Sequence, residues 1–427
     1  MRRVLIVLLL LCVLGTAGNT QAAGVSAAKR EVVVWMWTAH VTDLYNTWRE
    51  KITAWFEEDH PEATLKFEFV PNSPDKLLTA AASGVVPDAS LASINYARDL
   101  YEAGALTDLD RYVADTPHLT EENFMPASWI FCQKDGHTFG IPWGLEVAAV
   151  LYNREHVAEA GLDERPEALK TWDHLVRHAQ RLRQIGADGR ITRSGYVSSF
   201  NRVTFASYLY SNGGEFYNAS GSQVAFNTEQ GTQALQFMYD LDKRYDIKAP
   251  GAGTATLPNR MSSMVYWETS AMNWGIEPTA PDFAQWLRMA PIPVGPQGTT
   301  PSGVGWGNMF VIPRGAKNPE LGWAVISVWM RPQVQVESFI HYGSVKASSS
   351  RRDFYSSPTF ARAMRSMPLL ASIPTILTYA KPYPYIRFPE INRQMAPLFS
   401  QVLAGTMAPA TALAESERIA NIVLAAE

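Results

Sequence analysis

Glu146 is the residue whose surroundings in this sequence best indicate a chemical task. It follows Leu145 and precedes the apolar run Val147–Leu151. A carboxylate in such a run is costly to bury unless it is paired or hydrogen-bonded. A carboxylate accepts several hydrogen bonds at once, and such charge-assisted bonds are roughly twice as strong as neutral ones. The position therefore favours an acceptor for donor groups of a bound molecule, with a capped or salt-bridged strand end as the alternative.

Two groups of candidate side chains come after predicted strands. Trp37 and His40 end or follow the run Glu31–Trp37, and open α/β sheets place their ligand crevices beyond the carboxyl ends of strands. Trp35 lies in the same run, and we expect it in the core. The second group follows the strand predicted over Gly84–Ser93 and consists of Ser93, Asn95 and Tyr96. For this group the alternative is an ordinary strand-to-helix turn in which Ser and Asn act as caps.

Signatures of catalysis are scarce in the sequence. It contains no Gly-x-Ser-x-Gly elbow, no His-Glu-x-x-His and no phosphate-binding loop ending in Gly-Lys-Ser/Thr. The stretch Gly303–Gly307 lacks the Gly-x-Gly-x-x-Gly spacing of a dinucleotide-binding loop. His174 and His178 stand four apart on a predicted helix, a geometry that suits zinc, but no acid or Cys accompanies them. We therefore predict no enzyme activity, no metal and no cofactor.

The first residues have the pattern of a cleavable export signal. Two arginines precede the apolar run Val4–Leu14, and small or polar residues follow as far as Ala22, so we predict a signal peptide over residues 1–22. The apolar run is well short of the roughly 20 residues that span a bilayer. Cys12 lacks the preceding Gly or Ala of a lipidated signal. We therefore expect an exported chain that is no longer attached to the membrane.

Composition narrows the choice of partner and fold. The chain has 37 basic and 41 acidic residues, and loss of the signal would remove Arg2 and Arg3. This acidic balance argues against nucleic acid or anionic lipid as a partner. Only Cys132 would remain after cleavage, so the fold must be stabilised by packing instead of a disulfide. The length makes two domains more probable than one. Many of the 13 Trp and 17 Tyr stand in Gly-rich or Pro-rich segments, where no helix face would bury them.

Strands and helices alternate in the predicted secondary structure, which indicates an α/β fold. We predict strands over Glu31–Trp37, Leu65–Val70, Gly84–Ser93 and Gly195–Val197. We predict helices over Tyr45–Glu58, Asp75–Ala82, Trp172–Gln184 and Thr228–Tyr239, and one long apolar helix from Asn318 to about His341.

Several motifs together resemble one known family. They are the segment Gly136–Asn153 with its Ile-Pro, the Lys170–Leu175 helix start, the Gly213-Gly214 module with Val224–Asn227, the Pro-rich Met289–Gly298, and a C-terminal Gly405-x-x-Ala-Pro-Ala. The chain resembles the family 1 extracellular solute-binding proteins, the sugar-type receptors of ABC importers. The resemblance implies a type II periplasmic binding protein with two α/β lobes, each a sheet flanked by helices, and a hinge of several crossings.

The same resemblance implies a division of the chain and a set of contacts. Residues 30–143 and 292–345 would form the N-lobe, and residues 147–288 and 346–427 the C-lobe. In this family the segment after Ile-Pro is a hinge strand that faces the ligand, so Glu146 would accept hydrogen bonds from sugar hydroxyls. The remaining expected contacts, beyond those named above, are Trp143, Trp267, Glu268 and Trp306. The flanking glycines of Trp306 leave its ring free to face a cavity, and a Trp face can cover the apolar face of a sugar ring.

The expected function is to capture a carbohydrate between the lobes in the periplasm and to deliver it to an ABC permease in the inner membrane. We expect the protein to be a monomer. Two alternatives stay open. Arg351, Arg352 and Arg387 lie where the resemblance thins; if Arg387 pointed inward, a phosphorylated polyol such as glycerol phosphate or its diester would be the ligand. A secreted carbohydrate-active enzyme would need two carboxylates, for which Glu146 and Glu268 could serve.

Overall fold

The first lobe is built around parallel strands. In the computed structural model, which describes residues 28–40, 43–342 and 349–426, β1 (Arg30–Trp37) pairs with β2 (Ala63–Val70). β3 (Ala89–Ser93) lies on the other edge of β1. The connections are helices α1 (Asp43–Asp59) and α2 (Pro74–Ser83), and α3 (Ile94–Glu102) follows β3. The predicted signal and the predicted lobe boundary at residues 345 and 346 lie outside the described ranges.

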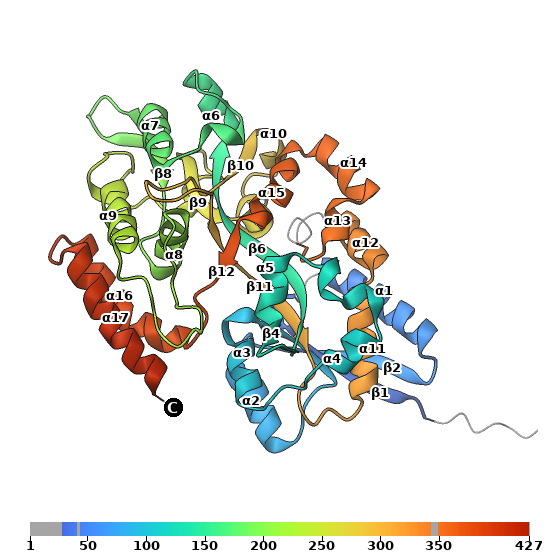
Figure 1. The fold of residues 1–427 in the computed structure, drawn as a ribbon. Helices are drawn as coiled ribbons and strands as arrows, with labels where there is room; N and C mark the ends of the chain where they lie inside the picture. The colour runs from blue at the N-terminus through green and yellow to red at the C-terminus, as the bar shows by residue number, and fades with distance from the viewer. Residues whose placement is uncertain (1–27, 41–42, 343–348, 427) are drawn as a thin grey trace, which may run out of the picture.

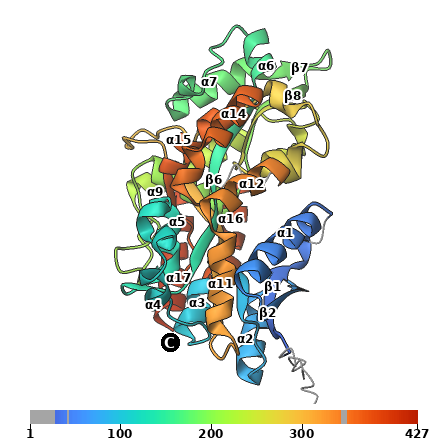
Figure 2. The ribbon, with the colours of Figure 1, turned by 90° about the vertical axis from the view of Figure 1, so that its right-hand side faces the viewer.

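Strand β6 (Ile141–Asn153) belongs to both lobes. Its first half pairs with β11 (Gly303–Val311), which in turn pairs with β3 of the first lobe. Its second half pairs with β9 (Ser262–Glu268) on one side and β10 (Leu287–Pro291) on the other. The resulting order is β2-β1-β3-β11-β6-β9-β8-β7, with β8 (Ile191–Val197) and β7 (Gln184–Ile185) at the far edge. Figure 1 shows one group of elements on each side of this long strand, and Figure 2 shows the strand running lengthwise between them.

Helices cover both lobes. The second lobe carries α6 (Arg154–Glu159), α7 (Trp172–Leu182), α8 (Arg202–Ser211), α9 (Glu229–Lys243), α10 (Phe283–Trp286), α16 (Phe388–Leu403) and α17 (Pro409–Ala425). The first lobe carries α4 (Asp110–Ala114), α5 (Pro126–Trp129), α11 (Pro319–Trp329) and α12 (Pro332–Tyr342), with the short strands β4 (Gln133–Lys134) and β5 (His137–Thr138). The segment α13 (Arg352–Tyr355), α14 (Pro358–Ser366), α15 (Ile373–Thr378) and β12 (Ala380–Pro382) then leads to the second lobe.

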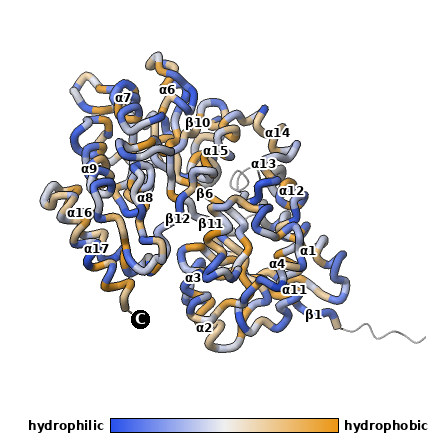
Figure 3. Tube along the Cα trace, viewed as in Figure 1, coloured by the Kyte–Doolittle hydropathy of each residue, from blue (hydrophilic) through white to orange (hydrophobic). Residues whose placement is uncertain are grey.

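Local patterns explain these elements. α7 begins at the Thr171 cap, whose hydroxyl accepts from the backbone of His174, and it buries Trp172, Leu175 and Ala179 on one face. In Figure 3 hydrophilic and hydrophobic residues alternate along the outer helices in the same way. The predicted strands Glu31–Trp37 and Leu65–Val70 are confirmed within two residues of their ends. The same holds for the helices predicted to start at Tyr45, Asp75 and Trp172. Among the described residues, no helix is both long and apolar enough to cross a membrane.

Four predicted elements were wrong in extent. The strand predicted over Gly195–Val197 starts already at Ile191, and the helix predicted over Thr228–Tyr239 continues to Lys243. The strand predicted from Gly84 starts only at Ala89, because Gly84 is the left-handed cap of α2 with φ of 70°. The single helix predicted from Asn318 to about His341 is two helices, α11 and α12. The break falls at Pro332, which has no N–H for the helix and disfavours helical backbone in the residue before it.

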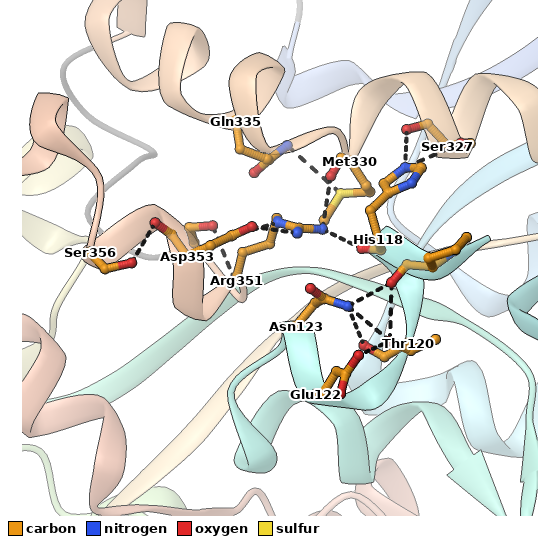
Figure 4. Close-up of polar contacts among 12 residues, drawn as sticks. His118, Thr120, Glu122, Asn123, Ser327, Met330, Gln335, Arg351, Asp353 and Ser356 are labelled. Carbon is orange, nitrogen blue, oxygen red and sulfur yellow. Dashed lines mark hydrogen bonds and ion pairs between the residues drawn. The ribbon is translucent and has the colours of Figure 1, made fainter.

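Arg351 stands directly before α13 and attaches this part of the chain to the first lobe. Its side chain is fully buried and forms two bonds of 2.8 and 2.6 Å with the Asp353 carboxylate. The same guanidinium donates to the backbone oxygens of His118 at 2.7 Å and Met330 at 3.0 Å (Figure 4). It also lies over the ring of Phe124. Arg351 is therefore a structural clamp, and its charge is already neutralised.

This clamp predicts unequal effects for two neighbouring arginines. Arg351→Leu should lower the free energy of unfolding by on the order of 2–4 kcal/mol, because it leaves two carbonyls and a carboxylate without their donor. Arg352→Leu, at the exposed next position, should change it by less than about 0.5 kcal/mol. Urea unfolding followed by circular dichroism measures both. Equal losses in the two variants would contradict the role assigned to Arg351.

Candidate ligand-binding site

A cavity of about 340 Å³ lies where the two lobes meet. The first lobe contributes Asn95 at the start of α3, and the crossing strand β11 contributes Trp306. The rest of the lining belongs to the second lobe or to the segment after β12, and consists of Ser199, Asn201, Val203, Thr204, Thr254, Tyr266, Trp267, Glu268 and Tyr383. A molecule in this cavity would touch both lobes at once.

Strand register explains why two acids share one face of the sheet. Trp306 stands opposite Glu146 in the β11–β6 pair, and Glu268 stands opposite Ala148 in the β9–β6 pair. Side chains of opposed residues lie on the same face, and so do residues two apart on one strand. Glu146, Glu268 and Trp306 therefore project from the same face. Glu146 and Glu268 are diagonal neighbours, a relation that corresponds to about 7–8 Å between Cα atoms.

Both carboxyls are strongly desolvated. Burial raises the pKa of Glu146, while the Ser270 hydroxyl and the Trp306 indole act in the opposite direction. Burial, with the nearby charge of Glu146 as the second cause, raises the pKa of Glu268 to about 8. At neutral pH Glu268 therefore keeps its proton. Among the described residues, no basic side chain lines this cavity.

Aromatic rings and unpaired acceptors form the rest of the lining. Trp306 and Tyr383 meet edge to face with ring centroids 6.3 Å apart, and the Tyr383 N–H donates to the Gly305 carbonyl at 3.1 Å. Asn95 Oδ1 and Thr204 Oγ1 are buried without a hydrogen-bond partner. Buried polar atoms are nearly always paired in folded proteins, so such orphans in a cavity indicate missing partners.

Capping bonds position the polar residues. The Ser93 hydroxyl accepts from the Asn95 N–H at 3.3 Å, which fixes the first turn of α3. Asn201 caps α8 in the same manner by accepting from the Thr204 N–H at 3.0 Å. The N-terminal turns of α3 and α8 thus approach the cavity, one from each lobe.

The structure brings five of the predicted site residues together. Asn95, Trp267, Glu268 and Trp306 line the cavity, and Glu146 projects from the same sheet face as Glu268 and Trp306. Trp267 is only 8% exposed, and its ring packs closely on Gly275, where an added Cβ would lie 2.6 Å from the indole. It contributes more to the wall than to the open surface.

Other predicted site residues lie elsewhere. Trp37 and Trp143 belong to the core of the first lobe, where Trp143 packs on Phe310 and Trp329. Ser93 is buried and serves as the α3 cap. The remaining three are Tyr96, His40 and Arg387. The Tyr96 hydroxyl donates to Asn72 at 2.7 Å. His40 ends a turn, and its side chain lies outside the described residues.

Arg387 is engaged outside the cavity. Its Nε donates to Glu390 at 2.5 Å and its Nη1 donates to the Ala426 carbonyl at 2.9 Å. It begins α16 and does not belong to the cavity lining. The structure therefore gives no support to an anion grip by this residue.

Sequence reasoning missed seven lining residues, namely Ser199, Asn201, Val203, Thr204, Thr254, Tyr266 and Tyr383. Ser199 and Asn201 follow the carboxyl end of β8, so the rule that pointed to Asn95 could have found them. Tyr266 is two residues before Glu268 on β9 and shares its face. Tyr383 carried no such local signal.

A contact between the lobes is made from α3, the helix that begins beside Asn95. Arg98 of α3 donates to the Tyr385 hydroxyl at 3.1 Å, and Tyr385 also meets Phe131 edge to face with centroids 6.1 Å apart. The segment that carries Tyr385 is held by the second lobe, where Tyr217 donates to the Ile386 carbonyl at 3.1 Å. These contacts set the distance between the lobes near Asn95.

Candidate metal ligands lie elsewhere on the surface. Among the described residues, Asp108, Asp110 and His137 bring ligand atoms within 4.8 Å of one another, and all three are exposed. Ion pairs of 3.0 and 2.9 Å from His137 Nδ1 to the two acids account for this grouping. His174 and His178 use their Nδ1 atoms for the Thr171 hydroxyl and the His174 carbonyl.

A sheet shared by two lobes, with a cavity lined from both, defines a two-lobed binding protein. Residues 38–336 match the bacterial extracellular solute-binding proteins, and this chain belongs to that family. The arabinooligosaccharide-binding protein of Halalkalibacterium halodurans is 26% identical over 230 residues, which cover 51% of this chain and 47% of that relative. This chain thus matches about half the length of that relative.

Solved structures of two-lobed sugar-binding proteins share the fold. The sugar-binding protein MalE of Xanthomonas citri superposes with a TM-score of 0.78 at 19% identity, covering 92% of this chain and 97% of that one. The cyclic alpha-maltosyl-1,6-maltose binding protein of Arthrobacter globiformis gives a TM-score of 0.77 at 20% identity, covering 93% and 99%. The expected two-lobed α/β fold is confirmed.

The acid pair predicts a pH-dependent stability. Burial raises the pKa of Glu268 to about 8 in the folded protein, whereas in an unfolded chain the carboxyl loses its proton near the ordinary glutamate pKa of 4.5. Between these values the folded state binds more protons, so the stability falls as the pH rises. Glu268→Gln removes this loss. Its gain in free energy of unfolding should be about 2–4 kcal/mol larger at about pH 8 than at pH 5, with allowance for partial exposure of the carboxyl.

Thermal and urea unfolding at the two pH values measure this difference. Glu277→Gln is the matched control, because Glu277 is an exposed acid outside the cavity. The control should change stability little and equally at both pH values. A Glu268→Gln gain that does not grow with pH would show that the carboxyl titrates normally.

Proposed function

We propose that this protein is the substrate-binding component of an ABC importer and captures a carbohydrate in the cavity between its lobes. The observation that carries this proposal is the lining itself, with aromatic rings, the acid Glu268 and unpaired acceptors from both lobes. Glu146 projects from the same sheet face as Glu268. Rings suit the apolar faces of sugars, and the acceptors suit their hydroxyls. The names of the relatives, which bind arabinooligosaccharides or maltose-type sugars, support the same ligand class.

Capture would work through lobe closure. Neither lobe holds the whole lining, so a ligand that contacts Asn95 on one side and Glu268 on the other binds the closed form more tightly than the open one. That differential affinity shifts the population toward closure. Hinge closure around a ligand is a known motion of periplasmic binding proteins. A permease in the inner membrane would then bind the closed form.

The proposal extends to the organisation and location of the chain. We propose that residues 30–143 and 292–345 form the N-lobe and that residues 147–288 and 346–427 form the C-lobe, and the crossing strands β6 and β11 support a division of this kind. Within the last segment, the contacts of Arg351 with His118 and Met330 attach its start to the N-lobe. Residues 1–22 would direct export to the periplasm and then be removed. The mature protein would act as a monomer that meets the permease. Purification from the periplasmic fraction, with mass spectrometry of the N-terminus, tests the cleavage after Ala22.

The two alternatives are less well supported. A phosphorylated polyol would bring its charge next to Glu146 and Glu268, with no cation in the described lining to receive it. A glycoside hydrolase needs two carboxyls that flank the scissile bond. Here both acids project from one face of one sheet, so they approach a ligand from the same side. Incubation with oligosaccharides should give stoichiometric binding without products.

A thermal-shift screen tests the main proposal. Mono-, di- and trisaccharides are compared with glycerol phosphate and sugar phosphates. A ligand present at a hundredfold over its Kd should add about 2.7 kcal/mol of stability. Stabilisation by phosphates alone would overturn the carbohydrate assignment, and so would stabilisation by no sugar at all.

Trp306 provides a specific prediction for binding. Trp306→Ala should weaken the affinity for the best sugar by ~10–100-fold, because burial of a ring face contributes about 1.5–3 kcal/mol. Trp55→Ala is the control, since Trp55 lies on α1 against Trp48 and outside the cavity. Isothermal titration calorimetry measures both affinities below the unfolding temperature of each variant. Equal weakening in the two variants would place the ligand elsewhere.

A further inference from the structure

We propose, as a refinement that rests on the proposed function, that the natural ligand is a saccharide bearing a protonated amine, which sits between Glu146 and Glu268. The two acids share a sheet face beside the cavity. Two separate acceptors in the same lining, Asn95 Oδ1 and Thr204 Oγ1, are buried without partners, and Thr204 is completely buried. The acids and the orphan acceptors are independent signs of a missing donor.

Among the residues that the structure describes, no cation lines the cavity beside the two acids. β11 presents Trp306, α3 presents Asn95, and the start of α8 presents Val203 and Thr204. The loops contribute Ser199, Asn201, Thr254 and Tyr383, none of which is basic. The only charged group among the influences on Glu268 is Glu146, which repels it. The nearby Arg202 is buried, lies over Phe216 and donates to the Pro384 carbonyl at 3.4 Å. It does not line the cavity, and it is not among the groups that shift the pKa of Glu146 or Glu268.

Two other acids of this chain, the buried Asp88 and the partly exposed Glu68, have donors within the protein. Asp88, only 4% exposed, accepts from the backbone N–H groups of Val33 at 2.9 Å and Asn318 at 2.7 Å. Glu68 accepts from the Trp35 indole at 3.0 Å and pairs with Lys66 at 3.0 Å. Glu146 has only neutral donors, the Ser270 hydroxyl and the Trp306 indole, and Glu268 has only a backbone donor. Among the described residues no cation pairs with either acid as Lys66 does with Glu68, which indicates that their compensating charge comes with the ligand.

An ammonium group suits the position between the two acids better than a hydroxyl group does. It has three donors and a full charge, so one group can satisfy both carboxylates, whereas a hydroxyl has a single proton to donate. The diagonal spacing of about 7–8 Å between the two Cα atoms lets both side chains reach a common point. Trp306 and Tyr383 beside them supply ring faces that attract a cation.

Binding should displace a proton. In the empty protein Glu268 holds its proton up to about pH 8. When the ammonium arrives, the carboxylic O–H bond breaks, the proton goes to the solvent, and both carboxylates face the cation. Near neutral pH the complex therefore releases up to one proton, and a neutral sugar should release none.

Matched sugar sets test the inference. Glucosamine, galactosamine and the chitosan disaccharide are each compared with the parent sugar that has a hydroxyl in place of the amine, and with the N-acetyl form. Titration calorimetry near pH 7 in phosphate and in Tris gives the affinity and the number of protons released. At least one amine form should bind ~10-fold or more tightly than both counterparts, which corresponds to about 1.4 kcal/mol.

Variants distinguish a specific loss of amine binding from a general loss of sugar affinity. Glu146→Gln and Glu268→Gln should each reduce the preference for the amine to below ~2-fold and abolish proton release. Glu277→Gln, on the exposed surface of the same lobe, should leave both unchanged. Retention of the amine preference in both cavity variants would overturn the assignment of the pocket.

The outcomes also distinguish this inference from the function on which it rests. If neutral sugars bind and no amine form surpasses its counterparts, the amine pocket is refuted while carbohydrate capture stands. If no sugar of either kind binds, the proposed function fails and the inference fails with it. Displacement of a bound amine sugar by Ca²⁺ alone would assign the acids to a metal ion and would overturn the inference.

Discussion

Strand β6 is the constraint on which the arrangement of this molecule depends. Its first half is hydrogen-bonded to β11 of the first lobe and its second half to β9 and β10 of the second. Because side chains alternate along a strand, a shift of one residue in this register would move Glu146 to the opposite face. The close approach of β11 to β6 at Gly307 helps to fix the register, since a Cβ on Gly307 would lie 2.0 Å from the Gly144 carbonyl oxygen. The positions of the acids, the Trp306 ring and the cavity therefore follow from one strand pairing.

Polar groups beside the cavity are paired differently from those around Arg351. Arg351 shows the ordinary solution, with a carboxylate and two carbonyls around one guanidinium. Beside the cavity the acids repel each other and the acceptors lack donors. Such unsatisfied groups lower the stability of the empty protein, and they increase the gain when a ligand with matching donors enters.

Local patterns predicted the elements and part of the site. Glu146 was recognisable because a charge stands within an apolar run, and Asn95 because it follows the end of a strand. Trp37 and Trp143 were predicted to face the ligand and lie in the core, because a strand buried on both faces gives no signal for the side that meets the cavity. Tyr383 could not be predicted from the sequence, for a different reason. Its position depends on the pairing of β12 with β11, a long-range contact that no local pattern encodes.

The unsatisfied lining has a consequence for the lifetime of the protein. A guest that binds only the folded form stabilises it by mass action, and the population of open, protease-sensitive chains falls accordingly. The desolvated pair on β6 and β9 widens that difference between vacant and filled molecules. Degradation would then remove vacant copies first, so the supply of a bound guest would set the abundance of the protein without any change in synthesis.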